Sequence, residues 1–250
     1  MPFKFEGQNK YITDSTFSRL SLKGKRDESL IKSFISKLLM LGVDFIEMSK
    51  YTMPPALINK DIIIYKVENI EDMRGLSKEN IKLVLYSYKT DFDLCNIINY
   101  IENQNFNIII ELYIDEFLRV DAILLKMKLK KLYSLRFKGM SHFDEALKGE
   151  LIKVKAKGYK IDLCFNDKLD LATASALEGL DYYDFLTGAF NGGGDFTYAS
   201  LEEVVLSLNV LYKVKVSLDS NILSKMSEEY TLLTGNKINS MKAISRKGYI

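Results

Sequence analysis

Eight short apolar runs, each followed by a stretch with helical periodicity, recur along the chain of 250 residues. Such runs, rich in β-branched and aromatic residues, are typical of parallel strands covered on both faces. Strand–helix units in unbroken succession, with no Gly/Ser-rich linker, predict a single (β/α)8 barrel over residues 1–250. An open, doubly wound sheet is the alternative. The predicted strands are 10–16, 43–49, 61–67, 81–88, 107–115, 131–137, 160–166 and 182–190.

The stretches between these runs carry helix signals. Residues 27–42 place leucines and a phenylalanine on one face and end at Gly42, a residue suited to the position just after a helix. Residues 141–158 follow the same pattern. Ser200 and Glu203 have the spacing of a capping box, which predicts a helix starting there.

Composition excludes several classes of function. The chain is 47% hydrophobic and 27% charged, with a formal net charge of +2 and no basic block, so we expect no nucleic-acid partner. The beginning of the sequence is polar and no apolar run approaches the ~20 residues of a membrane span, so we expect a cytoplasmic protein without a membrane partner. Cys95 and Cys164 are expected to be reduced thiols in the core.

In a (β/α)8 barrel the chemistry belongs at the C-terminal ends of the strands. The loop Asn191–Asp195, "NGGGD", is the strongest local signal there, because consecutive glycines let backbone N–H groups surround an anion. The same loop is also compatible with a simple crossing into the last helix. Other polar residues at predicted strand ends are Asp14, Glu47, Ser49, Lys66, Glu68, Ser87, Glu111, Asp115, Arg136, Lys138, Asn166 and Asp167.

Three segments carry a family resemblance: "YITDSTFSRL" (11–20), "VDFIEMS" (43–49) and the long stretch from "DLCFND" (162–167) to "LSL" (206–208). Together they resemble the pyruvate carboxyltransferase or HMG-CoA-lyase-like family of metal-dependent barrels, and within it homocitrate synthase and isopropylmalate synthase. The resemblance implies a TIM barrel and an ancestry in acetyl-CoA-dependent condensation with a 2-oxo acid.

The same resemblance implies that the metal chemistry is lost. The family's catalytic arginine corresponds to Ser18 and its metal-binding aspartate to Arg19. The two histidines of the family's His-x-His-Asn-Asp motif correspond to Leu163 and Phe165. The fourth ligand, an asparagine, corresponds to Tyr198 or a close neighbour.

Of the family's carboxylates, Glu47 stays in its expected place, and a family glutamate is represented by Asp195. The full sequence has one histidine, His142, so no pair of histidine ligands exists, and we expect no bound Zn, Mn or Mg and no other cofactor. A fixed positive charge on Arg19 would compensate these carboxylates in place of the metal; the alternative is that Arg19 points to solvent. His142 is either a polar residue at a helix start or a general base.

We therefore interpret the chain as a degenerate homocitrate or isopropylmalate synthase-like barrel. The expected role is a non-catalytic or accessory subunit that forms a homo-oligomer, or a hetero-oligomer with an active synthase-like homologue. The chain also ends where the family's capping subdomain would start. Alternatives are metal-independent aldolase, lyase or acyltransferase chemistry on a small 2-oxo acid, and a protein that binds such an acid. Candidate ligand-binding residues are Asp14, Arg19, Glu47, Asn191, Gly192, Gly193 and Gly194.

Overall fold

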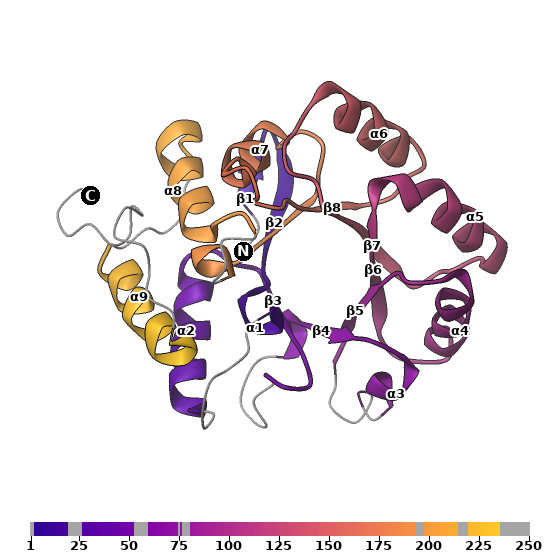
Figure 1. Ribbon diagram of the computed structural model, residues 1–250, viewed down its shortest axis with the longest axis horizontal. Coiled ribbons are helices and arrows are strands. Elements are labelled where there is room, and N and C mark those ends of the chain that lie inside the picture. The colour runs from indigo at the N-terminus through magenta and orange to yellow at the C-terminus, as the bar shows by residue number, and fades with distance from the viewer. Residues whose placement is uncertain are drawn as a thin grey trace.

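Parallel strands close into a barrel with helices around it, which confirms the (β/α)8 prediction over the open sheet (Figure 1). The computed structural model describes residues 3–19, 27–52, 60–74, 76, 81–193, 198–214 and 220–235. The first barrel strand pairs with the last, and every neighbouring pair between them is parallel. The barrel strands are β2 (Gln8–Asp14), β3 (Phe45–Met48), β4 (Ile63–Val67), β5 (Leu83–Ser87), β6 (Asn107–Tyr113), β7 (Leu132–Lys138), β8 (Ile161–Cys164) and β9 (Phe185–Gly188).

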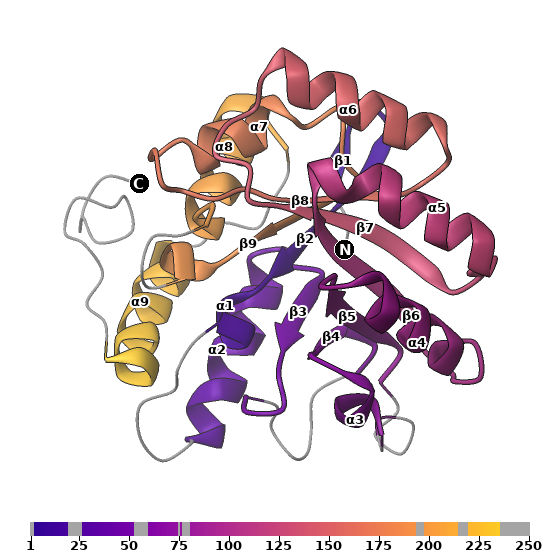
Figure 2. The same ribbon diagram turned by 45° about the vertical axis from the view of Figure 1, so that its right-hand side comes forward.

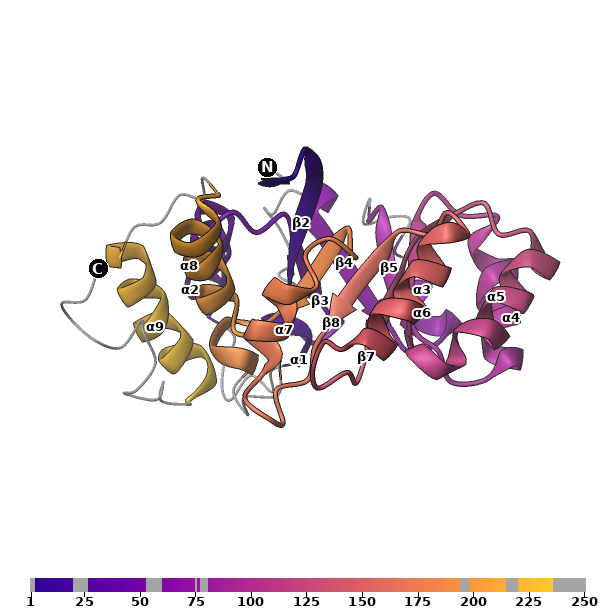
Figure 3. The ribbon, with the colours of Figure 1, turned by 90° about the horizontal axis from the view of Figure 1, so that it is seen from above.

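Each predicted run overlaps one of these strands, but a further strand was missed. β1 (Phe3–Phe5) forms an antiparallel hairpin with the start of β2 through a turn at Glu6 and Gly7, both at positive φ. Three residues are too few to show a periodicity. The hairpin extends the N-terminal end of the barrel, on the side opposite α1 (Thr16–Arg19) (Figure 3).

The outer helices begin and end largely at the expected signals. Gly42 and Gly158 both adopt positive φ just after their helices. The predicted capping box is wrong, because the Ser200 hydroxyl donates to the Glu202 carboxylate and does not cap its helix. The helices are α2 (Glu28–Met40), α3 (Ile70–Met73), α4 (Asp91–Ile101), α5 (Phe117–Met127), α6 (Glu145–Ala156), α7 (Ala172–Glu178), α8 (Leu201–Tyr212) and α9 (Ser220–Thr234), with short 3-10 turns η1 (Lys60–Ile62), η3 (Ile114–Glu116) and η4 (Phe190–Gly193).

The C-terminal helix α9 packs against α2 at the outside of the barrel (Figure 2). An aromatic cluster joins it to the chain near the strand ends. The Phe34 ring on α2 lies 5.3 Å from the Phe190 ring and 5.7 Å from the Phe17 ring, centroid to centroid, and Tyr230 of α9 lies 5.6 Å from Phe190. No helix among the described residues is long and apolar enough to span a membrane.

The inside of the barrel differs in polarity between its two ends. At the N-terminal end, here called the floor, the rings of Tyr11, Phe45, Tyr133 and Phe185 contact one another. A small apolar cluster of Ile64, Leu83, Leu85 and Ile109 packs with Phe45 and Tyr133. Charged side chains gather at the C-terminal end, here called the mouth. The apolar floor therefore supports a polar layer above it.

Candidate functional site

Arg136 of β7 is the centre of the polar layer, and its side chain is 0% exposed. Its Nε donates to Asp162 of β8 at 2.7 Å, and its Nη1 donates to Glu47 of β3. Glu111 of β6 lies 3.8 Å from Nη1. Burial lowers the pKa of Arg136, but the attraction of these three carboxylates outweighs it and raises the pKa well above its ordinary value. The guanidinium is therefore charged and joins four strands of the barrel.

The hydroxyls around this cluster hold its carboxylates in place. Thr187 of β9 donates to Asp162 at 2.8 Å, and Ser18 of α1 donates to the second oxygen of Glu47. The Nη2 atom of Arg136 is buried without a hydrogen-bond partner among the described residues. Because charge-assisted hydrogen bonds are worth more than neutral ones, the cluster is the strongest polar feature of the barrel interior.

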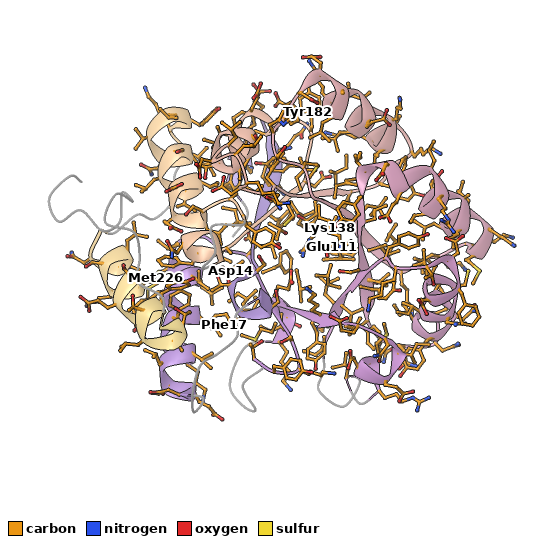
Figure 4. The ribbon with its side chains drawn as sticks, in the orientation of Figure 1. Asp14, Phe17, Glu111, Lys138, Tyr182 and Met226 are labelled. Atoms are coloured by element: carbon orange, nitrogen blue, oxygen red, sulfur yellow. The ribbon has the colours of Figure 1, made fainter. Side chains whose placement is uncertain are left out.

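Glu111 and Lys138 extend the cluster towards solvent. Lys138, the last residue of β7, donates to Glu111 Oε1 at 3.1 Å, and Ser87 of β5 donates to the same oxygen. The Lys138 side chain is 25% exposed, whereas that of Glu111 is 3% exposed. Figure 4 shows the two residues next to each other on the inner side of the barrel wall.

Asp14 ends β2 at the rim of the mouth and is fully buried. It accepts hydrogen bonds from the backbone N–H of Thr16 at 3.2 Å and from the Thr16 hydroxyl. Burial raises the pKa of Asp14 to about 7; bonds from Thr16 and Phe190 oppose this, and the nearby charge of Glu47 adds to it. Asp14 therefore changes charge near neutral pH.

The described part of the glycine loop binds a carboxylate of the protein itself. Asn191, Gly192 and Gly193 all have positive φ, which explains the glycines. The Asn191 N–H points at the buried carboxylate of Glu202, with N···O distances of 3.1 and 3.2 Å. The side-chain N and O atoms of Asn191 are buried and have no hydrogen-bond partner within the described part of the chain. Gly194 lies outside the described residues. The backbone N–H at the start of the loop thus contacts a carboxylate of α8, and anion binding by the glycines stays a prediction.

The strand that carries the family motif turns Asp162 inwards. Since side chains alternate along a strand, Leu163 faces the helices, and both Leu163 and Phe165 belong to the main apolar core. Asn166 accepts from the Lys168 N–H at 3.0 Å and Asp167 from the Ala172 N–H at 2.8 Å. The pair therefore shapes the turn before α7, which begins at Ala172.

Several predicted site residues lie elsewhere or are not described. The side chain of Arg19 and all of Asp195 lie outside the described residues. Tyr198 is half-buried and forms a backbone bridge with Asn166. His142 is 51% exposed, with Nε2 3.2 Å from the Asp144 carboxylate at the start of α6.

The residues at the mouth do not fit the metal that the family resemblance implies. Among the described residues, no group of three or more His, Cys, Asp or Glu side chains could hold a metal ion. The carboxylates that come together here face the guanidinium of Arg136 and the ammonium of Lys138. A divalent cation in the same place would meet two fixed positive charges.

Asp162 was absent from the sequence-based candidates, and Arg136 and Lys138 were noted only as polar strand ends. An acidic residue inside the apolar run "KIDLCFN" requires a buried partner, and that requirement was the available signal. Arg136 of β7 supplies a guanidinium to Glu47, and the expected contact of Arg19 with the kept carboxylates, which falls outside the described side chains, stays a prediction.

Comparison with known proteins places the chain among barrels of this kind. No family model matches. A homocitrate synthase omega subunit of Clostridium pasteurianum is 28% identical over 258 residues, covering 98% of this chain and 71% of that protein. The HMG-CoA lyase structure of Bacillus subtilis has a TM-score of 0.72 at 16% identity, covering 96% of this chain and 98% of that one. A dihydropteroate synthase structure of Vibrio fischeri has a TM-score of 0.54 at 10% identity, over 85% of this chain and 99% of that one.

The sequence similarity extends over almost the whole chain, and the fold agrees with it. This similarity confirms the resemblance to the pyruvate carboxyltransferase or HMG-CoA-lyase-like family. The chain is therefore a homologue of a homocitrate synthase omega subunit, built on the (β/α)8 barrel that HMG-CoA lyase also adopts.

Proposed function

We propose that this protein is an accessory, non-catalytic subunit that acts in a complex with an active homocitrate-synthase-like partner. The observation that carries the proposal is the ion-pair cluster of Arg136 with Glu47 and Asp162 in the centre of the barrel. Three strands use their inward-facing charged groups to neutralise one another, so these groups are not available as metal ligands.

The relative supports the subunit part of the proposal, because that protein is itself named a subunit of homocitrate synthase. The sequence supports the non-catalytic part, because a single histidine cannot supply the family's His-x-His pair. The catalytic arginine of the family is represented by Ser18, whose hydroxyl contacts Glu47. A barrel with these replacements retains a surface for association and lacks the groups for the synthase reaction.

The test combines binding with activity. The tagged chain is expressed in its native cell and pulled down, and light scattering measures the mass of the purified protein. We expect self-association or recovery of a synthase-like homologue, with an interface of roughly 1,200 Å² or more. A strict monomer that recovers no such homologue would contradict the proposal.

The activity arm measures thiol release from acetyl-CoA with 2-oxoglutarate, 2-oxoisovalerate or pyruvate. The purified chain alone is expected to give no release above background. Thiol release by the purified chain alone would contradict the proposal that it is non-catalytic. The proposal that it is a subunit would then be tested by the pull-down alone.

Binding of a 2-oxo acid as the main function is less well supported. Nε and Nη1 of Arg136 already donate to protein carboxylates, so the bidentate grip that arginine offers a ligand carboxylate is used up. One specific observation favours metal-independent carbonyl chemistry. Lys138 and Glu111 form a hydrogen-bonded pair at the mouth.

A further inference from the structure

Lys138 is a primary amine at the mouth of the barrel, beside the buried carboxylate of Glu111. It is the last residue of β7, which anchors its backbone between β6 and β8. The side chain is 25% exposed, so the amine lies between the buried cluster and solvent. A strand end of a barrel is a rigid position, which suits a group that must meet a ligand in one geometry.

Local structure holds this lysine from both sides. On one side Glu111 accepts its hydrogen bond at 3.1 Å. On the other, the ammonium lies 5.2 Å from the centre of the Tyr113 ring. That ring packs against Gly139, where an added Cβ would come within 2.6 Å of it and where φ is +82°. Glycine after the lysine therefore allows the aromatic ring to lie beside the amine.

The charges around the amine favour one class of ligand. Glu111 contacts it directly, and Glu47 and Asp162 lie behind on the same Arg136 cluster. Three carboxylates face two cations here, Arg136 and Lys138, so the cluster has one negative charge in excess, which disfavours a ligand carboxylate and does not affect a neutral carbonyl group. We propose that Lys138 binds a small neutral aldehyde or ketone covalently as an imine, with Glu111 as the proton carrier. This goes beyond the accessory role and does not depend on it.

The step balances without another reactant. Glu111 takes a proton from the Lys138 ammonium, the free amine adds to the carbonyl carbon, and one N–H proton of the added amine passes to the carbonyl oxygen. The resulting hydroxyl leaves as water with the proton that Glu111 returns, and a protonated C=N bond remains. The ammonium and the carbonyl are thus converted to an iminium and one water, and no electrons are exchanged.

The experiment traps the imine on the intact chain. The protein is incubated with dihydroxyacetone, a neutral ketone, and reduced with borohydride, and peptide mass spectrometry measures the modified fraction of each lysine. We expect the fraction at Lys138 to exceed that at Lys153, which is 64% exposed, by about tenfold or more. Equal or lower modification at Lys138 would overturn the proposal without any variant.

Two variants and a second probe test the assigned roles. Glu111→Gln keeps the amine but removes the proton carrier, so trapping at Lys138 should fall by about 100-fold. Lys66→Arg, which replaces a half-buried lysine near the end of β4, should leave the trapping at Lys138 unchanged. Unchanged trapping at Lys138 in folded Glu111→Gln would refute the role of Glu111 as the proton carrier. Stronger trapping by pyruvate than by dihydroxyacetone would refute the neutral class.

Discussion

At the scale of single residues, Arg136 shows what the sequence could and could not predict. The paired charges of a barrel interior predict that a guanidinium must neutralise Glu47, and this chemical requirement is met. The sequence suggested Arg19 and did not indicate Arg136, because Arg136 and Glu47 are separated by 89 residues and only barrel closure brings them together. Asp162 was missed for the same reason.

Replacing Arg136 by methionine should therefore lower the free energy of unfolding by about 3–5 kcal/mol, since three buried carboxylates lose their shared cation. Urea unfolding followed by circular dichroism measures the change. The matched control is Arg119→Met, which breaks an exposed pair with Asp91 and should leave the midpoint in place. Equal midpoints for the two variants would show that the Arg136 cluster contributes little.

Asp14 should make stability depend on pH. Its pKa is about 7 in the folded protein and 3.8 when unperturbed, so between these values the folded state binds the proton that the unfolded state has lost. Its contribution to stability is full below about pH 4, falls as pH rises to about 7 and is constant above, a loss of up to about 4 kcal/mol.

Asp14→Asn removes this titration. The stability difference between the variant and the wild type should therefore move in favour of the variant as pH rises from 5 to 7, in urea titrations at each pH. Parallel curves would mean that Asp14 keeps its charge throughout.

At the scale of elements, periodicity predicted every barrel strand and the helices α2, α6 and α8, because burial imposes a regular apolar pattern on both. Sequence-based prediction failed where contacts with other elements determine the local hydrogen bonds. Ser200 bonds Glu202, whose carboxylate serves the loop at Asn191, so local spacing alone could not predict the cap.

The contribution of α9 can be tested through its aromatic contact. Tyr230 is buried against Phe34 and Phe190, so Tyr230→Ala should cost about 3–5 kcal/mol by leaving a cavity between α9, α2 and η4. Leu232→Ala, on the same helix but 72% exposed, should cost almost nothing. Thermal unfolding of both variants gives the comparison. A small effect of Tyr230→Ala would mean that α9 is only loosely held.

At the scale of the whole molecule, the recurrence of strand and helix was enough to predict the closed barrel. The candidate site was only partly predictable, because its members come from β3, β6, β7, β8 and α1 and meet only in three dimensions. Family motifs identified positions along the sequence. They did not show which face of β8 each position occupies.

The metal content is a property of the whole site. Because Arg136 and Lys138 already neutralise the carboxylates at the mouth, the purified protein should contain far less than one Zn, Mn or Mg per chain after dialysis. Elemental analysis by mass spectrometry measures this, with the protein concentration from amino-acid analysis. A retained stoichiometric metal would require a site other than the one expected from the resemblance.

The pairing of β2 with β9 also sets a delay during synthesis. Lys10 bonds Tyr183 and Ser15 bonds Gly188, contacts that join residues 173 positions apart. At about 5–20 residues per second, a ribosome needs roughly 10–35 s between making one side of this seam and making the other. Throughout that interval one edge of β2 lacks its final neighbour, and such an edge is open to wrong strands. The growing chain is thus most exposed to mispairing at its first barrel strand.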